Sequence, residues 1–182
     1  MLLAELFESR SANLYHGTNL ASLVKMLETN IMKRGIYRSR FISFSRDSGM
    51  SINFAVGKAD EQTGLKSVPV MLVMDQELLY RKFGKKLRPY NDLDTEEHGN
   101  TARSGSGSES EEALYSDIHG VNSFIKQIVI QMPVNKYRLG QLAPLMHIIE
   151  PILQDPRTVV RNFTDKNITG RQFLKLIDTQ KQ

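Results

Sequence analysis

The sequence contains no cysteine among its 182 residues. This absence excludes a disulfide scaffold, a zinc ribbon and a thiol nucleophile, and it is compatible with a reducing cytoplasm. No apolar run approaches the roughly 20 residues that span a bilayer. The first residues carry acids rather than the basic region of a signal peptide. We therefore expect a soluble, cytoplasmic protein with no membrane partner.

The familiar sequence motifs of enzymes are also missing. The chain has no HExxH, no GxSxG, no Walker A and no zinc-deaminase motif. Its four histidines are widely separated, and none pairs with another at a metal-ligand spacing. The Gly105-Ser-Gly107 segment lacks a preceding strand and a following apolar helix, which favours a linker over a phosphate loop. We therefore predict no metal site.

The composition fits a folded domain with an uneven charge. Hydrophobic residues make up 40% of the chain and charged residues 24%, so wholesale disorder is excluded. Residues 91–112 carry a charge of −6, and because the net charge is +4, the rest carries +10. Such a surface attracts nucleotides or nucleic acids, although most basic surfaces are simply solvated. Two clusters hold many of the basic residues: Lys33, Arg34, Arg38, Arg40 and Arg46, and Lys82, Lys85, Lys86 and Arg88.

Hydrophobic periodicity predicts alternating strands and helices in the first three quarters of the chain. Polar residues at Thr18 or Asn19 and at Asp47 or Ser48 are suited to cap two of the helices. Residues 17–19 are expected to form a turn that closes the first strand. The predicted helices are 2–9, 20–27, 48–56 and 76–83, and the predicted strands are 14–16, 41–45, 68–74, 113–115 and 124–132, with a turn around His119-Gly120.

The segment from Asn91 to Ser110 is poor in apolar residues and rich in glycine, serine and acids. It cannot bury enough apolar surface to become ordered, so we expect a mobile acidic surface loop. After Pro133 the pattern becomes helical, over 139–153 and 168–177. These patterns predict a mixed α+β domain over residues 1–135, followed by a mostly helical C-terminal extension over 136–182.

Three segments, in this order, carry a possible function: Leu14-Tyr-His-Gly-Thr18, Phe41-Ile-Ser-Phe-Ser-Arg-Asp47 and Ser110-Glu-Glu-Ala-Leu-Tyr115. Over about residues 14–132 the chain resembles the ADP-ribosyltransferase superfamily, particularly its small phage- and toxin-type members. The resemblance implies a split, mostly antiparallel sheet flanked by helices, and NAD⁺ as co-substrate of a glycosyl transfer. It also implies that a phage-encoded protein would act in the cytoplasm of a host cell.

The resemblance implies a role for several residues. Cleavage of the bond between nicotinamide and ribose develops positive charge on the sugar, and a carboxylate at the ribose 2′-OH stabilises that charge most in the transition state. Glu112 takes this position, with Ser43 in the place of the serine of the second motif. His16 would bond the adenosine-side ribose, and the backbone of Gly17 would hold the nicotinamide amide where a Cβ would interfere. Tyr15, Thr18, Phe44 and Ser45 complete the cofactor-binding set, with Phe44 or Tyr37 stacking on nicotinamide.

Each of these residues also has a simpler explanation. His16 fits a turn histidine bonded to backbone. Ser43 and Ser45 alternate with apolar residues, as in any half-buried strand. Glu111 and Glu112 fit the end of an acidic loop, and either one fits the catalytic position.

The acceptor stays open between protein and nucleic acid. Arginine-modifying members of the superfamily carry an E-x-E pair, which Ser110 interrupts if Glu112 is catalytic and which Glu109 and Glu111 supply if the register slips by one. Two alternatives remain. One is an RNA 2′-phosphotransferase-like enzyme, which would need Arg34, Arg38, Arg40 and Arg46 at a phosphate site. The other is a non-catalytic binding or virion-associated protein on the same fold.

Overall fold

The computed structural model describes residues 13–35, 40–59, 62–89, 111–132, 143–161 and 167–179. The strands are β1 (Asn13–Asn19), β2 (Ile31–Met32), β3 (Ile42–Ser45), β4 (Pro69–Asp75), β5 (Leu87–Pro89), β6 (Glu111–Leu114), β7 (Ile118–His119), β8 (Ile125–Gln131), β9 (Thr158–Arg161) and β10 (Asn167–Thr169). The helices are α1 (Leu20–Thr29), α2 (Ser48–Ala59), α3 (Gln76–Phe83), α5 (Met146–Gln154) and α6 (Gly170–Thr179). Short 3₁₀ helices cover residues 64–67, 84–86, 121–123 and 143–145.

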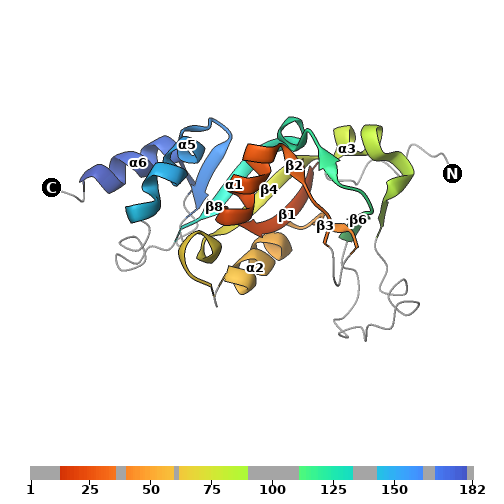
Figure 1. Cartoon of the computed structure of the whole chain (residues 1–182), viewed down its shortest axis with the longest axis horizontal. Coiled ribbons are helices and arrows are strands. Elements are labelled where there is room, and N and C mark those ends of the chain that lie inside the picture. The colour runs from red at the N-terminus through yellow and green to blue at the C-terminus, as the bar shows by residue number, and fades with distance from the viewer. Residues whose placement is uncertain are drawn as a thin grey trace.

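One eight-stranded sheet runs through the molecule in the order β10-β9-β8-β4-β1-β3-β6-β5, and β2 pairs with β7 separately (Figure 1). Its neighbouring strands are antiparallel, except that β8 and β9 are parallel. Strand β1 is central and pairs along its whole length with β4. The predicted class, α+β with a mostly antiparallel sheet between helices, is confirmed.

Polar residues at the strand ends start three of the helices. The Asn19 side chain accepts a hydrogen bond from the Ser22 backbone N–H at 2.9 Å and caps α1. Asp47 accepts from the N–H of Gly49 at 2.6 Å, and Asp75 accepts from the N–H of Leu78 at 3.0 Å. These bonds satisfy N–H groups that a helix cannot satisfy internally.

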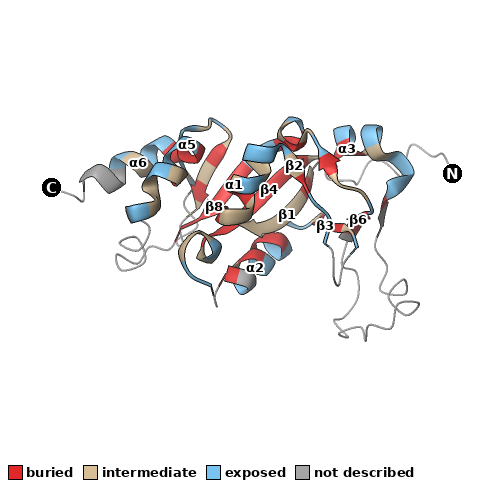
Figure 2. Cartoon of the chain, in the orientation of Figure 1, coloured by how far each residue is buried: buried red, intermediate tan, exposed pale blue. Residues whose placement is uncertain are grey.

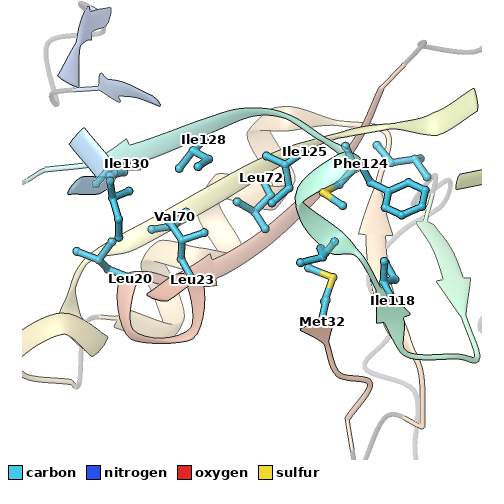
Figure 3. Packing of buried hydrophobic residues seen from close by; sticks show 14 of the residues in the cluster. Leu20, Leu23, Met32, Val70, Leu72, Ile118, Phe124, Ile125, Ile128 and Ile130 are labelled. Carbon is cyan, nitrogen blue, oxygen red and sulfur yellow. The ribbon is translucent and has the colours of Figure 1, made fainter. Parts of the chain in front are cut away.

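The two faces of the sheet bury different clusters of apolar residues. Figure 2 shows buried residues along β4 and β8 of the sheet. The larger cluster joins one face to α1, α3 and α5, and Figure 3 shows part of it, with Leu20 and Leu23 of α1 beside Val70 and Leu72 of β4. On the other face Ile52 of α2 packs with Met71, Val73 and Val129. Alternate residues of a strand point to opposite faces of the sheet. Each strand residue can therefore be assigned to the face of one cluster or to the face of the other.

One prediction about the elements was wrong. Residues 17–19 do not form a turn, because β1 continues through Asn19 and remains in register with β4 up to the Asn19–Pro69 pair. The C-terminal part, predicted to be mostly helical, also contributes two strands that the sequence analysis did not predict: β9 and β10 extend the main sheet, and Val160 of β9 joins the larger apolar cluster. Both strands are too short to give a clear alternating pattern.

Some predictions fall on residues that the structure does not describe. The helix at 2–9, the acidic loop at 91–110 and the domain boundary at 135 lie outside the described residues, so these stay predictions. Within the described residues, every helix falls short of the length and apolar character needed to cross a bilayer.

Candidate active site

The three motif segments lie on neighbouring strands of the sheet. The first motif is on β1, the second on β3 and the third on β6, and these strands are adjacent in that order. Tyr15 is in register with Ser45 across β1 and β3. Phe44 is in register with Glu112 across β3 and β6. Segments almost 100 residues apart in sequence therefore meet at one part of the sheet.

Register and alternation place His16, Phe44 and Glu112 on the same face. Phe44 belongs to the larger apolar cluster, and its partner in register, Glu112, points the same way. The rings of His16 and Phe44 meet edge to face, with centroids 5.9 Å apart. The predicted cofactor-binding histidine and the predicted catalytic glutamate thus flank one phenylalanine.

The two serines of the second motif belong to the other face. Ser45 pairs in register with Tyr15, which packs against the α2 cluster. The Ser45 Oγ accepts a hydrogen bond from the Asp47 N–H at 2.9 Å, so it shapes the turn into α2. Ser43 is two residues earlier and also alternates away from Glu112. The structure therefore brings neither serine side chain to Glu112, and a catalytic Ser43 stays a prediction.

Ser43 contributes to the site through its backbone. Its carbonyl oxygen lies 2.8 Å from Nδ1 of His16. A carbonyl only accepts, so this contact assigns the proton to Nδ1 and makes Nε2 the acceptor of the neutral ring. An imidazole fixed in this tautomer is suited to accept a hydrogen bond from a sugar hydroxyl.

Glu112 is completely buried, and its carboxylate is bound on both oxygens. Arg46 donates to Oε1 through Nε at 2.8 Å and also through Nη2. Tyr80 donates its hydroxyl to Oε2 at 2.5 Å. The exposed fraction is 0% for the Glu112 side chain and 25% for Arg46. Burial of a carboxylate costs free energy that partners of this kind offset.

The same contacts act on the charge of Arg46. Burial lowers the pKa of the guanidinium, but the hydrogen bond and charge of Glu112, together with Tyr80, outweigh it and raise the pKa above the usual value. Arg46 is therefore a permanent cation beside Glu112. The three side chains form one polar group at the end of the apolar cluster.

Gly17 is required by packing, whatever else it does. A Cβ at this position would lie 2.3 Å from the backbone oxygen of Ser51 in α2. Ser51 also donates its hydroxyl to the Tyr15 carbonyl at 3.0 Å, which fixes α2 against β1. This close approach explains the glycine without a ligand, so holding the nicotinamide amide stays a prediction for Gly17. Thr18 lies further along β1, paired with Val70.

Sequence reasoning misses the role of two residues. In the sequence Arg46 belongs to a basic cluster, although its position two residues after Phe44 places it on the same side as Glu112 if the strand geometry continues. Tyr80 gives no signal, because it lies on α3 outside all three motifs. Of the other arginines suggested for a phosphate site, Arg40 is exposed and the backbone N–H of Arg34 binds Asp117. Arg38 and Tyr37 lie outside the described residues.

Among the described residues, no group of three or more histidine, aspartate or glutamate side chains is arranged to hold a metal ion.

No protein-family model and no curated protein matches the chain. Among solved structures it is similar to Thermus sp. 2.9 DarT in complex with NAD⁺, with a TM-score of 0.46 and 14% sequence identity. The match covers 82% of this chain and 95% of the other.

Proposed function

We propose that this protein is an NAD⁺-dependent ADP-ribosyltransferase that moves ADP-ribose to a macromolecular acceptor and releases nicotinamide. The observation that carries the proposal is the placement of His16, Phe44 and Glu112 on one face of three adjacent strands. These are the residues that the sequence resemblance assigns to NAD⁺ binding and catalysis.

In the proposed reaction the bond between ribose C1′ and the nicotinamide nitrogen breaks, and its electron pair leaves with nicotinamide. Positive charge develops on the ribose, and a nucleophile of the acceptor forms the new bond at C1′ and loses its proton to solvent. The Glu112 carboxylate would accept the ribose 2′-OH and stabilise the developing charge. Arg46, whose pKa the hydrogen bond and charge of Glu112 raise above the usual value, would supply the positive charge that compensates this carboxylate.

His16 would bind the co-substrate, and Phe44 would support its ring. The Nε2 of His16 is the acceptor of the ring when Nδ1 donates to Ser43, which suits a ribose hydroxyl. Phe44 is 0% exposed, so it supports the His16 ring rather than offering a free face for stacking. Glu112 is buried as well, so a sugar reaches it only when a covering side chain moves.

A non-catalytic binding protein on the same fold is the second candidate. It is favoured by the complete burial of Glu112 in an ion pair with Arg46, because a buried ion pair is also an ordinary structural feature. The two candidates differ in one property, the release of nicotinamide.

The test is incubation of the purified protein with NAD⁺ labelled in its adenylate part, together with cell lysate. Nicotinamide release is measured, and the products are digested separately with nuclease and with protease. We expect label in a macromolecule, and the digestion that frees it identifies the acceptor class. Glu112→Gln serves as the control with strongly lowered activity. No nicotinamide release and no labelled macromolecule would reject the transferase and leave the binding protein.

A further inference from the structure

The contact between Tyr80 and Glu112 links α3 to the proposed catalytic strand. Tyr80 donates its hydroxyl to Oε2 of Glu112 at 2.5 Å. Tyr80 lies 32 residues before Glu112 in the sequence and belongs to no motif. Strand pairing does not explain the contact, because α3 follows β4, and β4 is not adjacent to β6 in the sheet.

A count of the carboxylate's acceptor positions shows what this contact does. A carboxylate has about four lone-pair positions, two on each oxygen. Arg46 supplies two donors to Oε1, and Tyr80 supplies one donor to Oε2. The described residues therefore fill both positions of Oε1 and one of Oε2. The remaining position is on Oε2, and the Tyr80 bond decides where it points.

We propose that Tyr80 is a positioning residue, which holds Oε2 of Glu112 so that its remaining lone pair meets the ribose 2′-OH of NAD⁺. This inference rests on the proposed function. Tyr80 acts through Glu112 and has no contact with the reacting bond. Its hydroxyl lowers the freedom of the carboxylate to rotate, which is the kind of preorganisation that stabilises a transition state.

Apolar packing and a capping bond hold α3 in place. Leu79, the preceding residue, is 0% exposed and packs in the larger apolar cluster. Asp75 caps the start of the helix, and the ring of Tyr80 itself packs against the same cluster. Removal of the hydroxyl alone therefore leaves the packing of α3 intact, which separates a positioning role from a structural one.

The test is Tyr80→Phe, with Tyr115→Phe as the matched control. Tyr115 is 41% exposed and its ring packs on Phe41, so loss of its hydroxyl does not affect Glu112. We expect Tyr80→Phe to lower kcat for nicotinamide release about tenfold, the effect of one lost hydrogen bond to a charged group. The Kd for NAD⁺ should change less than about threefold. Tyr115→Phe should behave as the wild type.

A double-mutant cycle shows whether Tyr80 acts through Glu112. In a Glu112→Gln background the residual rate of nicotinamide release should be the same with and without the Tyr80→Phe substitution, because the charged oxygen that Tyr80 orients is gone. An equal loss in both backgrounds, or a wild-type kcat in Tyr80→Phe, would overturn the inference while the proposed function stands. A wild-type protein that releases no nicotinamide would instead overturn the proposed function.

Discussion

Phe44 and Glu112 are partners in register across β3 and β6, and both are 0% exposed. A buried carboxylate beside a buried phenyl ring is costly unless its charge is compensated. Arg46 and Tyr80 provide that compensation. The charge of Glu112 therefore matters both to the stability of the fold and to the proposed chemistry, and a substitution at Glu112 has to be tested for both.

Glu112→Gln is expected to lower kcat for nicotinamide release by about 10²–10³, the usual effect of losing one preorganised electrostatic group. It should also lower the free energy of unfolding by about 1–3 kcal/mol, because Arg46 loses its counter-charge. Rates are measured well below the unfolding midpoint, and stability by urea denaturation. Glu111→Gln is the matched control, because it makes the same change at the neighbouring glutamate. If Glu111→Gln removes activity and Glu112→Gln does not, the catalytic register is wrong by one residue and arginine becomes the expected acceptor.

His16→Ala is expected to raise the Kd for NAD⁺ about tenfold, because one hydrogen bond to the sugar is lost. The rate at saturating NAD⁺ should change less, because His16 would bind the adenosine-side ribose and not the bond that breaks. Its ring contacts the Ser43 carbonyl and Phe44. Calorimetric titration with NAD⁺ measures the affinity. His147→Ala is the control, because His147 is exposed and its ring contacts the Pro144 carbonyl. Equal affinities for the two variants would contradict a binding role for His16.

Gly17→Ala is expected to destabilise the fold by about 1–3 kcal/mol, with or without NAD⁺, because the new methyl group meets the Ser51 carbonyl oxygen at 2.3 Å. Gly57→Ala is the matched control in α2. A Cβ there meets nothing within 4 Å, so it should stabilise the helix by about 0.5–1 kcal/mol. Thermal unfolding of the two variants gives the comparison. A Gly17→Ala protein as stable as the wild type would show that α2 is not packed this closely on β1.

Local signals in the sequence predict much of the fold. The helix over 76–83 has the predicted bounds, because Asp75 caps its start and Gly84, at φ 49°, ends it. The long apolar run at 68–74 forms β4, which lies between β8 and β1 and is buried along most of its length. Such strands are recognised because they are apolar at every position.

The rest depends on contacts between distant residues. In the sequence Gly17 is typical of a turn, but its lack of a Cβ serves the packing of α2 on β1. Strand β9 is four residues long and is held by its parallel pairing with β8. The Tyr80 contact with Glu112 joins a helix to a strand with no shared motif. Pairings of this kind have no periodicity in the sequence from which to predict them.

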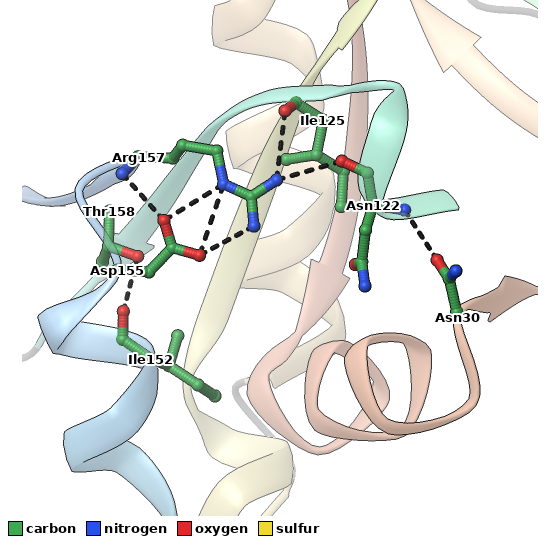
Figure 4. A network of polar contacts seen from close by, with 7 residues as sticks. All are labelled: Asn30, Asn122, Ile125, Ile152, Asp155, Arg157 and Thr158. Carbon is green, nitrogen blue, oxygen red and sulfur yellow. Dashed lines mark hydrogen bonds and ion pairs between the residues drawn. The ribbon is translucent and has the colours of Figure 1, made fainter. Parts of the chain in front are cut away.

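The ion pair between Asp155 and Arg157 connects the C-terminal strands to the rest of the sheet. Figure 4 shows Arg157 bound to Asp155 and to the carbonyl oxygens of Asn122 and Ile125. The contact joins the turn before β9 to the start of β8, and Asn30 at the end of α1 binds the Asn122 N–H at 3.0 Å. One charged group thus fixes the β8–β9 end of the sheet to the segment that leads into it.

This pair predicts how stability changes with pH. The hydrogen bond from Arg157 lowers the pKa of Asp155 below its ordinary value. The stabilisation is therefore present above the pKa of the unfolded chain, about 3.9, and is lost as the pH falls through the lower folded value. We expect Asp155→Asn to reduce the free energy of unfolding by about 1 kcal/mol near neutral pH. The difference from the wild type should shrink below about pH 4.

Urea unfolding near neutral pH and at about pH 3 measures both effects. Glu77→Gln is the control, because the Glu77 side chain is 80% exposed and that of its partner Arg81 is 70% exposed. Loss of such an exposed pair on one helix should cost no more than about 0.5 kcal/mol. A stability gap between Asp155→Asn and the wild type that is unchanged at the acid pH would mean that Asp155 acts through its shape and not its charge. The contacts of Arg157 with the start of β8 would then depend on the shape of the turn before β9 and not on the charge of Asp155.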